Sequence, residues 1–159
     1  MENRIIYFSG DATEPKTTGN VIIAHICNDL GAWGSGFVLD LSAKWEAPEE
    51  AYRKWHRSGV NFALGEIQVV PVAEGLSVVN MIAQRGLRGP DNTRPIRYGA
   101  VQSCLQKLAA TALASGASIH LPGIGCGRAG GRWDHIEPIL NHALIRLGIP
   151  VYVYDKEDL

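Results

Sequence analysis

Cysteine is scarce in this sequence, long hydrophobic runs are missing, and neither sign of charge is in excess. The three cysteines, Cys27, Cys104 and Cys126, are an odd number without paired spacing. This argues against a secreted disulfide framework and favours reduced thiols in a cytoplasmic protein. No Cys and His pattern of a zinc site is present, so we expect no metal. No apolar run approaches the roughly 18 residues of a membrane span, and Met1 to Arg4 lack the shape of a signal peptide.

The charge balance excludes two further classes of protein. The chain has 15 basic and 16 acidic residues and a formal net charge of −1, so neither a nucleic-acid-binding basic surface nor an acidic tail is indicated. Hydrophobic residues make up 46% of the 159 residues, which excludes disorder as the main state and fits one domain over residues 1–159. Glycine is abundant, with 18 residues, about 11% against a usual value of about 7%.

Short apolar runs alternate with segments of helical periodicity, which predicts an α/β protein. The run Val21–Cys27 is rich in β-branched residues and is typical of a strand buried on both faces. We expect a three-layer α/β/α sandwich with a mixed, mostly parallel central sheet. The expected strands are Ile5–Phe8, Val21–Cys27, Glu66–Val72, Leu76–Ile82, Ser118–Leu121 and Val151–Tyr154, and the expected helices are Leu39–Trp45, Pro48–Arg57, Tyr98–Ala114 and Asp134–Leu147.

Two glycine-rich segments occupy the same relative position, each between an expected strand and an expected helix. The first runs from Asn28 to Phe37 and the second from Gly123 to Gly131. Glycine lets backbone amides turn toward a ligand, and a helix N-terminus behind such a loop favours an anion. Two such loops at the carboxyl ends of strands indicate a site that binds a diphosphate mainly through backbone amides. The alternative is that these glycines only form tight turns.

The second loop is not a dinucleotide-binding fingerprint. Gly125, Gly127 and Gly130 fit G-x-G-x-x-G, but that motif belongs near the start of a βαβ unit and here lies close to the C-terminus. The Lys-Ser/Thr ending of a P-loop is also missing. A dehydrogenase is therefore disfavoured.

Five features together resemble the macrodomain family of ADP-ribose-binding modules over nearly the whole chain. They are Ser9-Gly10-Asp11-Ala12 after the first strand, the Asn28–Phe37 loop, the segment Leu121–Gly127, Trp133 at the next helix, and the ending Val151–Tyr154. The form of the first loop, Gly-x-Trp-Gly-x-Gly, resembles the branch that contains terminal ADP-ribose protein glycohydrolase, a chromatin-remodeller macrodomain and the yeast ADP-ribose-1″-phosphate phosphatase.

The resemblance implies a role for each matching residue. Asp11, with the Ala12 amide, would bind the adenine amino group, and Tyr154, past the last strand, would pack on adenine or serve as an ordinary edge aromatic. Asn28 would meet the distal ribose, beside Gln84. The remaining ligand-binding candidates come from the two glycine loops: Trp33, Gly34, Ser35, Gly36 and Phe37 in the first, and Gly123, Ile124, Gly125, Cys126, Gly127, Arg128, Ala129 and Gly130 in the second.

The catalytic residues of the nearest hydrolytic relatives are not all present. The lysine and aspartate of the glycohydrolase fall at Gln84 and Ala129 here, so a lysine–aspartate mechanism is excluded. Asn28 and Asp29 are the remaining candidates: Asn28 to orient water and Asp29 to position or deprotonate it. Each also has a plain alternative as a loop-capping residue.

The sequence therefore predicts a macrodomain that hydrolyses mono-ADP-ribose from modified targets, at an ester linkage to acidic side chains. The alternatives are a non-catalytic ADP-ribose reader, favoured by Gln84 and Ala129, and an ADP-ribose-1″-phosphate phosphatase. We expect ADP-ribose or an ADP-ribosylated protein as partner, with a modified nucleic-acid end as an alternative. We expect no membrane partner, no cofactor and a monomer. His25 and His120 are interpreted as buried core histidines rather than bases.

Overall fold

The computed structural model describes residues 4–87, 95–123 and 132–155. Within them, a six-stranded sheet has the order β1-β6-β5-β2-β4-β3. All neighbouring strands are parallel except β3 and β4, which form an antiparallel hairpin. The strands are β1 (Ile6–Ser9), β2 (Val21–Asn28), β3 (Ile67–Ala73), β4 (Leu76–Gln84), β5 (Ser118–Pro122) and β6 (Val151–Asp155).

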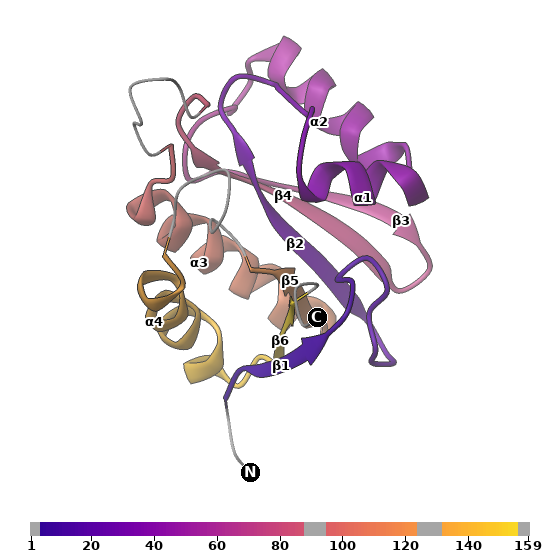
Figure 1. The fold of residues 1–159 in the computed structure, drawn as a ribbon, viewed down its shortest axis with the longest axis vertical. Helices are drawn as coiled ribbons and strands as arrows, with labels where there is room; N and C mark the ends of the chain where they lie inside the picture. Colours follow the sequence, from indigo (N-terminus) through magenta and orange to yellow (C-terminus); the bar gives the residue numbers. More distant parts are fainter. Residues whose placement is uncertain (1–3, 88–94, 124–131, 156–159) are drawn as a thin grey trace.

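Helices cover both faces of the sheet, as Figure 1 shows. The helices α1 (Phe37–Lys44) and α2 (Ala47–Ser58) lie on one face, and α3 (Tyr98–Ser115) and α4 (Trp133–Ala143) lie on the other. The expected three-layer α/β/α sandwich with a mixed, mostly parallel sheet is confirmed. Among the described residues, no helix is both long and apolar enough to cross a membrane.

Strand β2 is buried on both faces because its side chains alternate between two hydrophobic clusters. Ile22 and Ala24 pack in the cluster under α3 and α4, whereas Val21 and Ile23 pack in the cluster under α1 and α2. A continuous apolar run is what such a strand requires. The Val21–Cys27 run therefore marks a central strand with β5 and β4 on its two sides.

The last expected helix, Asp134–Leu147, is interrupted. Helix α4 ends at Ala143, Leu144 leaves the helical region with φ −120°, and a 3-10 turn over Ile145–Leu147 follows. The side chains of Leu144 and Ile145 are buried against the sheet, and Gly148 ends the turn with φ +80°. The apolar pattern continues through the break because both pieces face the core, so periodicity alone does not reveal the change of helix type.

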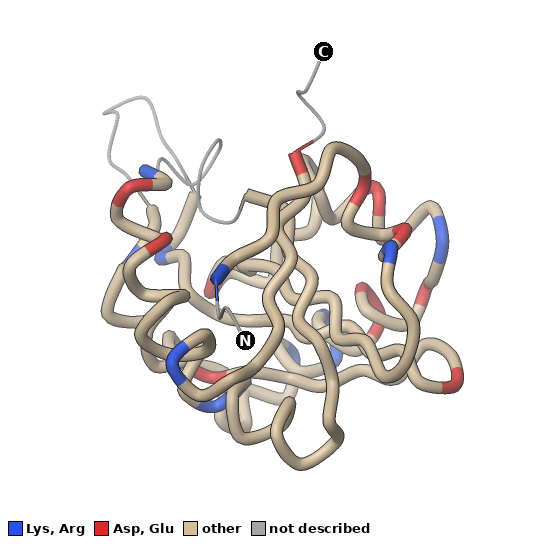
Figure 2. Tube along the Cα trace, turned by 90° about the horizontal axis from the view of Figure 1, so that it is seen from below, with Lys and Arg blue, Asp and Glu red and all other residues tan. Residues whose placement is uncertain are grey.

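Charged residues of both signs are distributed along the chain. Figure 2 shows acidic and basic positions interspersed on the trace, in keeping with the formal net charge of −1.

A buried histidine anchors the segment after β1 to the sheet. His120 Nδ1 lies 2.8 Å from the Tyr154 hydroxyl, which itself accepts the backbone N–H of Lys16 at 2.9 Å. The Tyr154 hydrogen is thereby directed at Nδ1, which leaves Nε2–H to donate to Ser118 Oγ at 2.8 Å or Thr17 Oγ1 at 3.1 Å. The neutral ring is the form that satisfies all of these partners.

Burial lowers the pKa of His120 to about 4 and that of His25 to about 4. Between pH 6.5 and 4 the unfolded chain therefore binds protons that the folded chain excludes. Stability is fully present above pH 6.5 and falls as the pH falls, by up to about 1.4 kcal/mol per pH unit for each histidine.

We predict that His120→Gln has a smaller loss of unfolding free energy between pH 7.5 and pH 5 than the unmodified protein. Urea titrations at both pH values measure the loss. His142→Gln, which changes an exposed histidine on α4, is the control and should keep the original pH dependence. Equal pH dependence in His120→Gln and the unmodified protein would contradict the buried, neutral assignment.

Candidate functional site

The carboxyl ends of β1, β6, β5, β2 and β4 lie along one edge of the sheet because these five strands are parallel. Ligands of open α/β sheets bind outside this edge. The first glycine loop leaves β2 there, and β4 ends beside it at Gln84, which pairs with Asn28.

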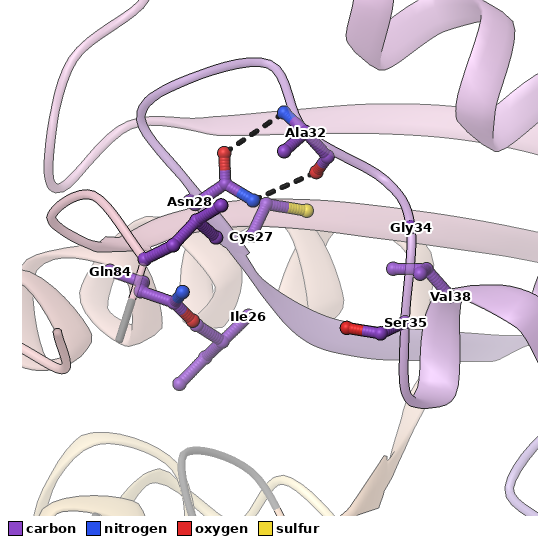
Figure 3. Close-up of a pocket in the computed structure, with 9 residues that line it drawn as sticks. Ile26, Cys27, Asn28, Ala32, Gly34, Ser35, Val38 and Gln84 are labelled. Atoms are coloured by element: carbon purple, nitrogen blue, oxygen red, sulfur yellow. Dashed lines mark hydrogen bonds between the residues drawn. The ribbon is translucent and has the colours of Figure 1, made fainter. Parts of the chain in front are cut away.

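A cavity of about 320 Å³ opens between the glycine loop and the end of β4 and is within the usual range of ligand pockets. Figure 3 shows Ser35 and Gln84 pointing into this space from opposite sides. Among the described residues, the lining carries no charged side chain; it consists of Ile26, Cys27, Asn28, Ala32, Gly34, Ser35, Val38, Gln84 and Leu87. The described lining thus offers amide groups, one hydroxyl, one thiol and apolar surface.

Asn28 shapes the start of the loop. It is only 8% exposed, and its Oδ1 accepts the backbone N–H groups of Leu30 at 2.9 Å and Ala32 at 3.0 Å. Its Nδ2 donates to the Ala32 carbonyl at 2.8 Å, as the dashed lines of Figure 3 show. The Tyr52 hydroxyl lies 2.8 Å from Oδ1 as well. The Asn28 oxygen is therefore fully used. Nδ2 makes one hydrogen bond among the described residues, and Asn28 is one of the cavity residues.

Asp29 fastens the loop to the turn after β4. Its Oδ1 accepts the Gly86 N–H at 2.7 Å, and its own N–H donates to the Gln84 carbonyl at 2.9 Å. Asp29 lies beside the cavity rather than among its lining residues. Its second carboxylate oxygen has no hydrogen bond to any described residue.

The outer part of the loop presents unused backbone donors. Gly34, Ser35 and Gly36 are exposed, and within residues 4–87, 95–123 and 132–155 their N–H groups form no hydrogen bond. Gly36 caps α1 with φ +82° and without a side-chain cap, so the positive end of the helix dipole stays open toward the loop. This arrangement suits an anionic group.

Trp33 and Phe37 face the core instead. Trp33 is 4% exposed, and its indole N–H donates to Ser42 Oγ at 2.8 Å. Phe37 packs against the cluster under α1 and α2. Neither is among the cavity residues. Both side chains pack on the core side of the loop.

The segment after β1 lies three strand spacings from β2, about 14 Å at roughly 4.8 Å per spacing. Asp11 Oδ1 accepts both the N–H and the hydroxyl of Thr13, at 2.8 and 2.7 Å, and Ala12 is buried. Tyr154 lies inside β6 rather than past it, and only 2% of it is exposed. Its ring therefore has little free surface on which to receive a base, because the strand carries it into the core beside His120.

The second glycine loop lies outside the described residues, except for Gly123, which is exposed directly after β5. The candidates in that loop are Ile124, Gly125, Cys126, Gly127, Arg128, Ala129 and Gly130, and they remain predictions.

Several cavity residues were not expected from the sequence: Ile26, Cys27, Ala32, Val38 and Leu87. Cys27 Sγ lies 3.8 Å from His25 Nε2, and a thiol this close to an imidazole could indicate a catalytic pair. Burial raises the pKa of the Cys27 thiol and lowers the pKa of His25 to about 4. Both groups are therefore neutral, and the pair is not an activated nucleophile.

The described architecture is that of an α/β module with a ligand cavity at the carboxyl edge of its sheet. No family model matches the chain. A protein of unknown function from Bacteroides thetaiotaomicron is 50% identical and aligns with a TM-score of 0.93 over 96% of this chain and 98% of its own. A macrodomain protein from Streptomyces coelicolor is 47% identical, with a TM-score of 0.85 over 96% of this chain and 99% of its own. The chain belongs to the macrodomain family.

Two more distant likenesses concern larger proteins. The chromodomain-helicase-DNA-binding protein 1-like of Mus musculus is 27% identical over 158 residues, and the match covers 94% of this chain but 17% of that protein. DarTG of Thermosipho africanus, solved in complex with ADP-ribose, is 16% identical over 84% of this chain and 37% of its own, with a TM-score of 0.70. The second likeness is one of fold alone.

Proposed function

We propose that this macrodomain binds ADP-ribose along the carboxyl edge of its sheet and hydrolyses mono-ADP-ribose from modified acidic side chains. The observation that carries the proposal is a cavity whose described lining has no charged side chain. Beside it, at the start of α1, are three backbone amides that form no hydrogen bond to any described residue. A diphosphate is an anion that such amides bind without a cationic side chain. The proposal is supported by DarTG, a protein solved in complex with ADP-ribose, part of which shares this fold.

In the proposed complex, the adenosine lies at the end of β1 and the distal ribose at the ends of β2 and β4. The span of about 14 Å between β1 and β2 suits an extended molecule with two riboses joined by a diphosphate. Asp11 and the Ala12 amide bind the adenine. The amides of Gly34, Ser35 and Gly36 bind a phosphate. The side-chain amides of Asn28 and Gln84 contact the distal ribose. The second glycine loop supplies the remaining phosphate contacts.

The proposed reaction is hydrolysis of an ester between the distal ribose and a carboxyl group. Water adds to the ester carbon, the bond to the ribose oxygen breaks, and that oxygen leaves with a proton as a ribose hydroxyl. Asp29 accepts the proton of the attacking water through the carboxylate oxygen that has no hydrogen bond to a described residue, and this proton then goes to the leaving ribose oxygen. An ester requires a weaker base than an amine glycoside does, which matches a site whose thiol and imidazole are both neutral.

The binding part is tested at Gly34, where an added Cβ would meet no heavy atom within 4 Å and where φ is not in the left-handed region. Gly34→Asp therefore leaves the fold intact but sets a negative charge against the diphosphate. We expect calorimetry to give ADP-ribose affinity at least about tenfold weaker than that of the unmodified chain. Gly34→Asn, with the same bulk and no charge, is the control and should bind more tightly than Gly34→Asp. Unchanged affinity in Gly34→Asp would remove this loop from the binding site.

The hydrolytic part is tested with Asp29→Asn, which keeps an oxygen to accept the Gly86 N–H and removes only the charge. Loss of a general base typically lowers turnover about 100-fold or more. We expect a loss of this size in release of ADP-ribose from glutamate-linked mono-ADP-ribosylated protein, with affinity changed less than about threefold. Full activity of Asp29→Asn would show that Asp29 has no chemical role.

A reader of ADP-ribose is the second candidate function. It is favoured because the side-chain oxygen of Asn28 and one carboxylate oxygen of Asp29 are already used to hold the loop. Tight ADP-ribose binding without release from the modified protein would select the reader, and release of phosphate from ADP-ribose-1″-phosphate would select a phosphatase.

A further inference from the structure

Helix α2 holds Gly31, in the middle of the first glycine loop, on three sides. The Gly31 N–H donates to the Tyr52 hydroxyl at 3.1 Å, and its carbonyl accepts from Arg53 Nη1 at 3.1 Å. Its α-carbon faces His56 so closely that an added Cβ would lie 2.4 Å from Nδ1 of that ring. The φ of +77° also requires glycine. One surface of α2 therefore fixes both polar groups and the position of this residue.

A circuit of hydrogen bonds connects Trp33, two residues after Gly31, back to the Gly31 carbonyl. The Trp33 indole donates to Ser42 Oγ at 2.8 Å, and the Ser42 hydroxyl donates to Glu49 Oε1 at 3.0 Å. Glu49 Oε2 accepts from Arg53 Nε at 2.9 Å. Arg53 closes the circuit at the Gly31 carbonyl, two residues before Trp33. The circuit thus links the loop to both α1 and α2.

These contacts leave the amides of one part of the loop without a hydrogen bond to any described residue. Asn28 is tied to Ala32 and Tyr52, Gly31 to α2, and Trp33 to Ser42 of α1. The next three residues, Gly34 to Gly36, are the ones whose amides form no hydrogen bond within the described chain. The circuit thus ends where the proposed phosphate contacts begin.

We infer that Arg53 and Glu49 of α2 are positioning residues for the ligand, holding the glycine loop in its binding conformation before the ligand arrives. This inference rests on the proposed function. A loop that is already ordered loses less conformational freedom when it binds. The Arg53 and Glu49 side chains are 43% and 34% exposed, and such ion pairs add little to global stability. Their expected effect is therefore on affinity rather than on folding.

The chain contains a closely matched control. Lys107 on α3 forms an ion pair with Glu66 at 3.1 Å and donates to the Gly65 carbonyl at 2.7 Å. Its side chain is 42% exposed, and it lies away from the glycine loop. Arg53 and Lys107 thus have the same kinds of bond and the same exposure, and they differ in what they hold.

The experiment compares Arg53→Met with Lys107→Met. We expect Arg53→Met to weaken ADP-ribose binding about fivefold or more, Lys107→Met to leave it within about twofold, and both to shift the urea midpoint by similar small amounts. Arg53→Lys should restore part of the affinity, because lysine keeps the charge but not the fork that reaches two acceptors.

A second readout needs no ligand. Backbone ¹⁵N relaxation of the free protein should show lower order for Gly34 to Gly36 in Arg53→Met than in Lys107→Met. Equal loop order in the two variants would overturn the inference, whether or not ADP-ribose binds. Failure of the unmodified chain to bind ADP-ribose, with loop order still lowered in Arg53→Met, would instead overturn the proposed function and leave the positioning role in place.

Discussion

Among the described residues, the backbone of the first glycine loop is hydrogen-bonded at Gly31 and Ala32 but not at the amides of Gly34 to Gly36, and the candidate site depends on this difference. The loop leaves β2, the strand buried between two hydrophobic clusters, so its starting point is fixed by core packing. Asn28 then bonds to Ala32, Tyr52 and Arg53 bond to Gly31, and Ser42 bonds to Trp33. With these partners in place, the amides of Gly34 to Gly36 need form no hydrogen bond within the described chain for the loop to keep its shape.

The chemistry of the cavity is set by neutral groups. Burial raises the pKa of Cys27 and lowers the pKa of His25, and the lining side chains described carry no charge. In the proposed function, such a site binds an anion through backbone dipoles, and bond cleavage depends on a nearby carboxylate. Asp29 is such a carboxylate, and its contact with Gly86 holds it at the cavity edge.

Much of the fold is predictable from the sequence because its signals are local. The β-branched run Val21–Cys27 indicates a central strand, and the apolar spacing after Tyr98 indicates a helix that ends at Gly116. The position of the first loop at a strand end follows in the same way. The supports of that loop were not foreseen, because Tyr52, Arg53 and Glu49 lie on a polar helix where the sequence pattern shows only a solvated face. The burial of the Tyr154 ring was not predictable for a related reason, since its hydroxyl contacts His120, a residue 34 positions away in the sequence.

The most direct test of the account is an ADP-ribose titration followed by amide resonances in ¹H–¹⁵N spectra of the unmodified protein. Binding along the carboxyl edge predicts saturable shifts at Gly34, Ser35 and Gly36 together with Asp11 and Ala12, so that both ends of that edge respond to one ligand. Saturable shifts confined to other surfaces, or no shifts at millimolar ADP-ribose, would contradict it.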